Sequence, residues 1–285
     1  MLNFLSVDTE DYYHATNLEP VLPRSKWLST ESRVEQLVQR VLEILSIHNT
    51  KATFFVLGFI AKKHPKLVKT IAVAGHEIAS HGFNHQLIYQ LSQNDFYQDV
   101  SEAKTLLEDL VGQKVIGYRA PNFSITDATP WAHEILAKAG YLYDSSVYPI
   151  YHPRYSNPDK PLNPYRVVTD HGSLVVFPLA VVAYKIFTKN INLPAAGGAY
   201  WRLLPLSYTR WALKTINNRE LRPAVCYFHP WELDSGQPYF AKLPLLSKIR
   251  HYQGLKSFPD KLERIIAINQ FSTLKTYYEQ VSDTL

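Results

Sequence analysis

The chain has 285 residues, of which 46% are hydrophobic and 13% aromatic, a composition that supports a large folded core and excludes a disordered protein. Its single cysteine, Cys226, excludes an intramolecular disulfide framework. The formal net charge is +5, but the basic residues are scattered, and Lys62 and Lys63 form the only adjacent pair. This pattern argues against a surface that follows a nucleic acid backbone, so we predict no nucleic acid partner.

Short apolar runs alternate along the chain with amphipathic helical patterns, which is typical of βα units around a parallel sheet or barrel. A helix with apolar positions from Val34 to Leu45 follows the first predicted strand, and Ser29 or Thr30 is expected to cap it. Gly140 is placed to end the helix that precedes it. The predicted strands are residues 3–7, 52–57, 76–79, 115–118, 141–143, 173–177 and 224–228; the other predicted helices are 65–74, 92–110, 130–139 and 259–280.

Between Ser145 and Leu204 the helical period fails, and repeated prolines favour a long irregular excursion. The stretch has too little continuous apolar pattern to form a domain of its own. We therefore predict one domain over residues 1–285, with a loop-rich insertion at about 145–204 and a C-terminal helical extension at about 257–285.

The start of the chain lacks the features of a signal peptide. Residues 1–7 have no basic leading region, and no long apolar run or small-residue cleavage site follows. No segment offers the roughly 18 uninterrupted apolar residues of a spanning helix. We expect a cytoplasmic protein without a membrane span.

Two histidines and an acidic cluster predict a metal site. His81 and His85 are four residues apart, so one helical turn would place both rings on the same face, where they could reach one Zn²⁺-like ion. A carboxylate from the cluster of Asp8, Glu10 and Asp11, at the end of the first predicted strand, would complete the ligand set and leave a position for water.

Three more polar residues follow predicted strands: Arg119, Asp144 and His229. Each has a simpler explanation when it is taken alone, as a surface arginine, a turn residue or helix cap, and a core histidine bonded to a carbonyl. Active sites of parallel barrels are built from the loops at the carboxyl ends of the strands. The joint placement of these residues with the acidic cluster and the histidine pair therefore favours an active site.

The chain resembles the NodB-homology polysaccharide deacetylases, metal-dependent amide hydrolases that remove acetyl groups from N-acetylated sugars. Residues 197–205, 229–234 and 251–255 most resemble the deacetylases associated with exosortase-linked exopolysaccharide gene clusters. The resemblance covers about residues 3–232 and implies an α/β fold, a distorted (β/α) barrel of about seven strands that is incomplete relative to a TIM barrel. It rests on five motifs: Asp8-Thr9-Glu10-Asp11, His81-x-x-x-His85, Arg119-Ala120-Pro121, Asp144-Ser145-Ser146-Val147-Tyr148 and Tyr227-Phe228-His229.

The resemblance also implies a ligand set of His81, His85 and one acid for a single divalent ion, most commonly Zn²⁺. Most relatives carry two adjacent aspartates in the first motif, and this chain departs from that pattern. The Asp-x-Asp spacing of other relatives would make Asp8 the general base and Glu10 the ligand, and alternation along a strand puts both on one face. Asp11 is the alternative ligand.

The remaining roles are likewise implied by the resemblance. Arg119 would aim the carboxylate of Asp8, and His229, oriented by Asp144, would protonate the departing amine. A backbone N–H near Tyr148 would help the ion to stabilise the negative charge that develops on the carbonyl oxygen. The residues expected to contact substrate are Pro121, Tyr148 and Trp231.

The predicted function is removal of N-acetyl groups from N-acetylhexosamine units of a cell-surface or exported polysaccharide, or of a lipid-linked glycan precursor, with peripheral contact to an export complex. One alternative is a metal-independent amide hydrolase similar to allantoinase, against which His81 and His85 argue. Another is a non-catalytic polysaccharide-binding subunit. The excursion from 145 to 204, ending in Ala199-Tyr200-Trp201, is expected either to stack on several sugar rings or to cover a gap in the barrel.

Overall fold

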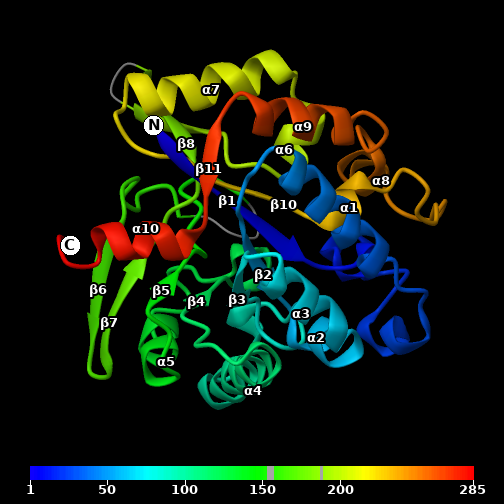
Figure 1. Cartoon of the computed structure of the whole chain (residues 1–285), viewed down its shortest axis with the longest axis horizontal. Helices are drawn as coiled ribbons and strands as arrows, with labels where there is room; N and C mark the ends of the chain where they lie inside the picture. The colour runs from blue at the N-terminus through cyan, green and yellow to red at the C-terminus, as the bar shows by residue number, and fades with distance from the viewer. Residues whose placement is uncertain (153–156, 187–188) are drawn as a thin grey trace.

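Helices surround a mostly parallel sheet in the computed structural model, which describes residues 1–152, 157–186 and 189–285 (Figure 1). The strands are β1 (Leu2–Thr9), β2 (Thr53–Val56), β3 (Glu77–Ser80), β4 (Gly117–Tyr118), β5 (Tyr143–Asp144), β6 (Tyr165–Thr169), β7 (Gly172–Val176), β8 (Val181–Ile186), β9 (Lys189–Pro194), β10 (Val225–Phe228) and β11 (Gln270–Ser272).

The helices fall into two groups. The α-helices are α1 (Val34–Ile47), α2 (Gly58–Lys63), α3 (Pro65–Val73), α4 (Gln93–Val111), α5 (Ala132–Lys138), α6 (Ala199–Leu203), α7 (Leu206–Asn218), α8 (Leu245–Tyr252), α9 (Phe258–Ala267) and α10 (Leu274–Val281). The 3₁₀ turns are η1 (Tyr12–His14), η2 (Thr16–Leu18), η3 (Arg24–Ser29), η4 (Ile88–Gln90), η5 (Pro121–Phe123) and η6 (Pro230–Leu233).

The strand order in the main sheet is β10-β1-β2-β3-β4-β5-β7-β6, and β11 pairs with the first residues of β1. All pairs along this order are parallel except the hairpin of β6 and β7. Parallel strands that are covered on both faces are apolar throughout, and all four residues of β2 and of β10 are buried. The expected fold class, an α/β barrel-like fold with a mostly parallel sheet, is confirmed.

The stretch from 145 to 204 is more regular than its sequence indicates. It contains the β6–β7 and β8–β9 hairpins and the short helix α6. Prolines in the connections hide the strand pattern. Part of the stretch lies on the free edge of β10, because the N–H of Ala180 donates to Val225 O and the N–H of Tyr227 donates to Ala196 O. This part therefore pairs with the edge of the sheet at β10.

Two other local predictions are wrong. The helix expected over 259–280 is interrupted by β11, because residues 270–272 pair with Leu2–Phe4 of β1. Ser29 and Thr30 do not cap α1, since they belong to η3 and to its end. Asp11 takes the capping role instead, and its Oδ2 accepts hydrogen bonds from the N–H groups of Arg33 and Val34.

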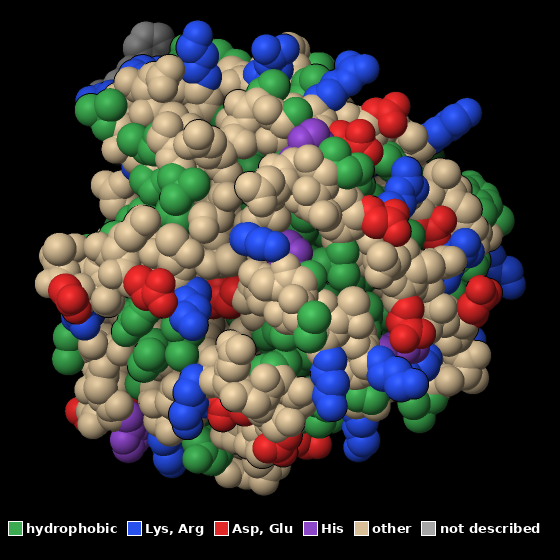
Figure 2. All heavy atoms as spheres, in the orientation of Figure 1, with side chains coloured by type: hydrophobic (Ala, Val, Ile, Leu, Met, Phe, Trp, Pro, Cys, Tyr) green, Lys and Arg blue, Asp and Glu red, His purple; other side chains and the backbone are tan. Residues whose placement is uncertain are grey.

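The surface shows no single-sign stripe on the face drawn in Figure 2, where Lys and Arg side chains are scattered among Asp and Glu. None of the helices among the described residues combines the length and the apolar character needed to cross a membrane.

Candidate metal centre and active site

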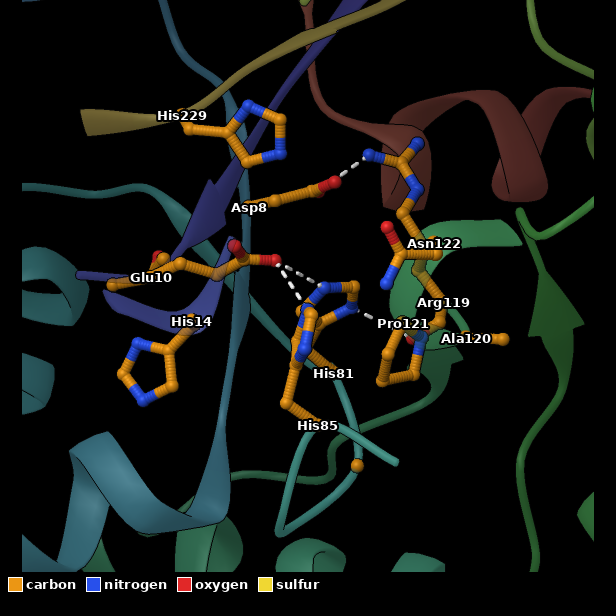
Figure 3. A network of polar contacts seen from close by, with 12 residues as sticks. Asp8, Glu10, His14, His81, His85, Arg119, Ala120, Pro121, Asn122 and His229 are labelled. Carbon is orange, nitrogen blue, oxygen red and sulfur yellow. Dashed lines mark hydrogen bonds and ion pairs between the residues drawn. The ribbon is translucent and has the colours of Figure 1, made fainter. Parts of the chain in front are cut away.

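The carboxyl ends of the parallel strands bring the predicted polar residues to one edge of the sheet. Asp8 lies at the end of β1, and His81, Arg119 and His229 directly follow β3, β4 and β10. Asp8, Glu10, His81, His85 and His229 surround a common space (Figure 3). Because loops converge at this edge over a packed interior, it is where parallel folds build their sites.

Glu10, His81 and His85 form a buried cluster with metal-binding character. The Oε1 atom of Glu10 lies 3.0 Å from Nε2 of His81 and 2.9 Å from Nε2 of His85. One ligand atom from each of the three residues lies within 4.8 Å of the others, and all three residues are buried. Two imidazoles and one carboxylate are the donors of many mononuclear zinc sites with an open position.

The hydrogen bonds of His81 fit a cation between these groups. Its Nδ1 lies 2.8 Å from the carbonyl oxygen of Arg119, which can only accept, so Nδ1 carries the proton. In the neutral ring Nε2 then presents a lone pair toward the carboxylate oxygen of Glu10, and two acceptors face each other unless a cation or proton lies between them. This N–H to carbonyl bond is the support commonly found behind a ligating histidine.

Charge at the cluster favours the ionised carboxylate of Glu10. Burial alone raises the pKa of a carboxyl group. The imidazoles of His85 and His81 outweigh burial and hold the pKa of Glu10 well below its usual range. Glu10 is therefore available as an anionic ligand.

The segment from His81 to His85 is a loop and not the helical turn that its spacing predicted. Gly82 and His85 have positive φ values of 73° and 53°. The carboxylate of Asp99, on α4, holds the loop by accepting hydrogen bonds from the N–H groups of Phe83 and Asn84 at 2.8 and 3.1 Å. This turn brings the two imidazoles together. The two rings therefore converge as expected, but a loop and not a helical turn places them.

Asp11, the alternative acidic ligand, does not lie at the cluster. Its Oδ1 accepts from the N–H of Tyr12, and its Oδ2 accepts from Ser32 Oγ at 2.6 Å and from the backbone at the start of α1. Both oxygens are thus used to cap η1 and α1. The structure therefore favours Glu10 over Asp11 as the acidic ligand.

Asp8 and Arg119 form a buried ion pair beside the cluster. Nη1 of Arg119 donates to Oδ1 of Asp8 at 2.7 Å, and both side chains are almost completely buried. The guanidinium is fixed by further bonds to Ser6 Oγ and to the carbonyl and hydroxyl oxygens of Ser145, and it stacks on the ring of Phe55 at 4.1 Å. Such a rigid donor can hold the carboxylate of Asp8 in one orientation.

His229 is oriented by a residue that the sequence reasoning missed. Its Nδ1 donates to Oε2 of Glu232 at 3.1 Å, and the other oxygen of Glu232 accepts from Nε of Arg202 at 2.6 Å. Burial lowers the pKa of an imidazole, but the bond to Glu232 and the nearby carboxylates raise the pKa of His229 to about 9. The ion pair with Arg202 outweighs burial at Glu232 and lowers its pKa to about 2.

The expected pairing of Asp144 with His229 is therefore wrong. Asp144 is fully buried, accepts hydrogen bonds from the hydroxyl and N–H of Ser146, and lies 3.2 Å from Nε2 of His133. It braces the loop after β5 and does not touch His229. The available signal for Glu232 was its position three residues after His229 across Pro230, the spacing of a capping box.

A cavity of about 260 Å³ opens above these groups. Its wall includes Trp231, which stacks on His229 with ring centroids 5.1 Å apart. The other two residues expected to contact substrate, Pro121 and Tyr148, do not line the cavity. Tyr148 packs against Phe123 and Tyr200, and these two residues do line it. The residues that line the cavity are Asp8, Glu10, Ala15, Thr16, Asn17, His85, Asn122, Phe123, His152, Ala199, Tyr200, Arg202, Leu203, Tyr227, His229, Trp231, Glu232 and Arg250.

The aromatic residues at the end of the excursion divide between wall and core. Tyr200 lines the cavity, whereas Trp201 is buried and donates its Nε1–H to Ala195 O at 2.9 Å. Trp201 therefore holds the segment in place and offers no face to a sugar.

Two family models match the chain. Residues 23–143 match the model of the polysaccharide deacetylase family. Residues 145–279 match a second family, a domain of unknown function called DUF3473. The part that is similar to polysaccharide deacetylases contains His81, His85 and Arg119, and the part that matches the second family contains His229 and Glu232.

Curated relatives match over part of the chain only. A peptidoglycan-N-acetylglucosamine deacetylase of Bacillus cereus is 32% identical over 100 residues, which is 35% of this chain and 36% of the relative. A peptidoglycan deacetylase of Helicobacter pylori is 28% identical over 110 residues, 39% of this chain and 36% of the relative. These matches span well under half the length of either relative.

Solved structures resemble the whole fold. A Mycobacterium smegmatis protein assigned as a polysaccharide deacetylase has a TM-score of 0.61 at 22% identity, covering 99% of this chain and 91% of that one. A Pseudomonas aeruginosa protein with the same assignment has a TM-score of 0.62 at 16% identity, covering 99% and 90%. Puue allantoinase has a TM-score of 0.56 at 16% identity, covering 94% and 85%. At these identities the likeness concerns the fold alone.

Proposed function

We propose that this protein is a metal-dependent hydrolase that removes N-acetyl groups from N-acetylhexosamine units of an exported polysaccharide or of its lipid-linked precursor. The observation that carries the proposal is the convergence of three groups on one cavity: the Glu10–His81–His85 cluster, the Asp8–Arg119 pair and His229. Hydrolysis of an amide needs a polarised carbonyl, a base for the attacking water and an acid for the leaving amine.

Glu10, His81 and His85 would hold one divalent ion, for which we favour Zn²⁺ because the donors are two nitrogens and one oxygen. When bound there, the ion supplies Lewis acidity toward the amide carbonyl and makes a nearby water more acidic. The deacetylase match over residues 23–143, which includes both histidines, supports this assignment.

The protein groups divide the proton transfers between them. Arg119 holds Oδ1 of Asp8, which leaves Oδ2 to take the proton of the attacking water. His229 carries a proton across the neutral pH range, because its pKa is about 9, and gives it to the departing sugar amine. Glu232 keeps the ring of His229 in position through Nδ1, so Nε2 is the nitrogen that delivers the proton.

The shape and polarity of the cavity suit a sugar. Trp231 and Tyr200 provide aromatic surface beside the polar groups, as carbohydrate sites commonly do. The glycan that we propose is a polymer of an exopolysaccharide gene cluster, because residues 197–205, 229–234 and 251–255 resemble the deacetylases of such clusters.

The test is acetate release by the purified protein from a soluble N-acetylglucosamine oligomer, with and without a chelator, and after Zn²⁺ is restored. We expect release that the chelator abolishes and Zn²⁺ recovers. Release that survives complete metal removal would favour the metal-independent, allantoinase-like alternative. A protein that binds the oligomer and metal but releases no acetate under any metal would be a binding subunit, and the proposed function would fail.

A further inference from the structure

The segment from Pro238 to Lys256 carries an exposed apolar surface next to the active-site cavity. In α8, Leu245 and Leu246 are 71% and 69% exposed, and Ile249 is 39% exposed. At 100° per residue these three side chains occupy one side of the helix, opposite the buried His251. Tyr239, in the preceding loop, is 64% exposed. Helix α8 therefore turns an apolar stripe toward solvent.

The segment that carries this stripe is basic. Residues 235–259 contain four basic residues, Lys242, Lys248, Arg250 and Lys256, and no Asp or Glu. Around the helix, Lys248 and Arg250 flank the apolar stripe on its two sides. The acids that precede the segment do not offset this charge, because Glu232 is paired with Arg202 and Asp234 with Arg33. An apolar stripe flanked by basic side chains is the pattern of helices that lie in a membrane interface.

The segment is held as a fixed platform. The Tyr252 hydroxyl donates to Pro238 O and accepts from the N–H of Phe240. The guanidinium of Arg202 donates to the carbonyl oxygens of Arg250, His251 and Gln253, where α8 ends. The loop before α8 and α8 itself lie at the edge of the molecule in Figure 1. Little ordering is therefore needed when this surface meets a partner.

We infer that the surface formed by Tyr239, Leu245, Leu246 and Ile249, with Lys242 and Lys248 beside it, docks on an anionic lipid bilayer. The apolar side chains would enter the headgroup region, and the cations would pair with lipid phosphates. Arg250, at the end of α8, also lines the active-site cavity, so docking brings the mouth of the cavity to the bilayer surface. That consequence, access to a lipid-linked glycan, rests on the proposed function, but the docking itself does not.

The experiment is co-sedimentation of the full chain with vesicles of phosphatidylcholine alone and of phosphatidylcholine with phosphatidylglycerol, at low and high salt. We expect binding to the anionic vesicles that salt weakens. The double variant Leu245→Ser/Leu246→Ser should lower the partition coefficient by tenfold or more per leucine, and each of Lys242→Ser and Lys248→Ser by about fivefold.

Matched controls lie on other faces. Leu221→Ser removes a leucine that is 75% exposed outside the segment, and Lys66→Ser with Lys69→Ser removes two exposed lysines of α3. These variants should bind vesicles like the unchanged protein. Acetate release from a soluble N-acetylglucosamine oligomer should be unaffected in the Leu245/Leu246 variant, which separates a docking defect from failure of folding or of the proposed chemistry.

Two results would overturn the inference. One is equal sedimentation of the Leu245/Leu246 variant and the unchanged protein with anionic vesicles. The other is an absence of vesicle binding together with a dimer, seen by light scattering, that the same two substitutions dissolve, because the surface would then be covered by a second copy of the chain.

Discussion

Nδ1 of His229 lies 3.1 Å from Oε2 of Glu232, three residues further along the chain, and the same oxygen also accepts the backbone N–H of His229 at 2.9 Å. One carboxylate therefore fixes both the ring and the backbone of the residue that we propose as the acid. Since Arg202 holds the other oxygen of Glu232, the ring orientation depends on a chain of two buried side chains, Glu232 and Arg202.

Removal of Glu232's charge should move the alkaline limb of activity. An acid must be protonated to act, so kcat/KM falls as the pH rises through the pKa of His229, which Glu232 helps to raise to about 9. In Glu232→Gln this pKa falls, and the alkaline limb of the kcat/KM profile should move to lower pH. The measurement is the pH dependence of acetate release.

The control for this variant separates the change in pKa from a loss of stability caused by the unpaired charge of Arg202. Loss of Glu232 leaves a buried guanidinium without its counter-charge, at a cost of about 3–5 kcal/mol of stability. The double variant Glu232→Gln/Arg202→Met removes both charges and should recover part of the lost stability, because the carbonyl oxygens of Arg250, His251 and Gln253 also lose their donor, while the shifted limb persists. An alkaline limb that stays in place in both variants would contradict the role given to Glu232.

Replacement of His81 by alanine should remove both metal and activity, because Glu10 and His85 alone hold a divalent ion weakly. Metal content is measured by mass spectrometry after dialysis, and acetate release by a coupled assay. His76→Ala is the matched control, since His76 lies before β3 and its Nδ1 accepts the N–H of Ala52. Full metal occupancy in His81→Ala would refute the site.

The two acids of the first motif should separate metal binding from proton transfer. Asp8→Asn should keep the metal and lose about 10²–10⁴-fold in turnover, because an amide cannot take the water's proton. Glu10→Gln should lose metal, because it removes the carboxylate between the two imidazoles. The opposite pattern in the two metal analyses would mean that the roles of the acids are exchanged.

Longer substrates should be better substrates. Tyr200 and Trp231 line the cavity beside His229, so additional sugar rings gain contacts that help to orient the amide. We expect kcat/KM to rise from the monomer to the pentamer of N-acetylglucosamine and Tyr200→Ala to flatten that rise. A value that is flat across the series in the unchanged protein would rule out an extended site while leaving the chemistry intact.

Gly197 should tolerate no side chain. It has φ of 138°, and a Cβ atom built there would lie 1.8 Å from the carbonyl oxygen of Tyr227, next to the strand end that carries His229. Gly197→Ala should cost more than about 4 kcal/mol of stability. Gly112→Ala is the matched control: φ is 66° with no atom nearby, and the expected cost is only about 1–2 kcal/mol. Equal denaturation midpoints for the two variants would contradict this expectation.

The periodic parts of the fold were predictable from the sequence, and the parts that depend on distant contacts were not. Strands β1, β2, β3 and β10 were expected because their apolar runs are buried on both faces. The strand β11 was missed because only its pairing with Leu2–Phe4 makes it a strand. Strand β7 was expected as residues 173–177, but β6, β8 and β9 were missed because the prolines around them obscure the alternation.

In the candidate site, too, the positions of the residues were predictable from the sequence, and their side-chain partners were not. The motifs placed Glu10, His81, His85 and Arg119 correctly at one edge, since strand ends converge in any parallel sheet. Partners within the site depend on side-chain direction, which no motif specifies. Asp144 faces His133 and Ser146, Asp11 faces the start of α1, and the acid that reaches His229 is Glu232.

The position of β1 between β10 and β2 has a consequence for biosynthesis. Strand β1 pairs through Phe4–Val7 with residues 225–228, which are made more than 200 residues later. Until then one edge of β1 exposes unpaired N–H and C=O groups, and pairing across so long a stretch of chain is slow. Chaperone demand during translation should therefore be high up to residue 228 and fall once β10 emerges, so truncation before β10 should give aggregation and not a smaller folded unit.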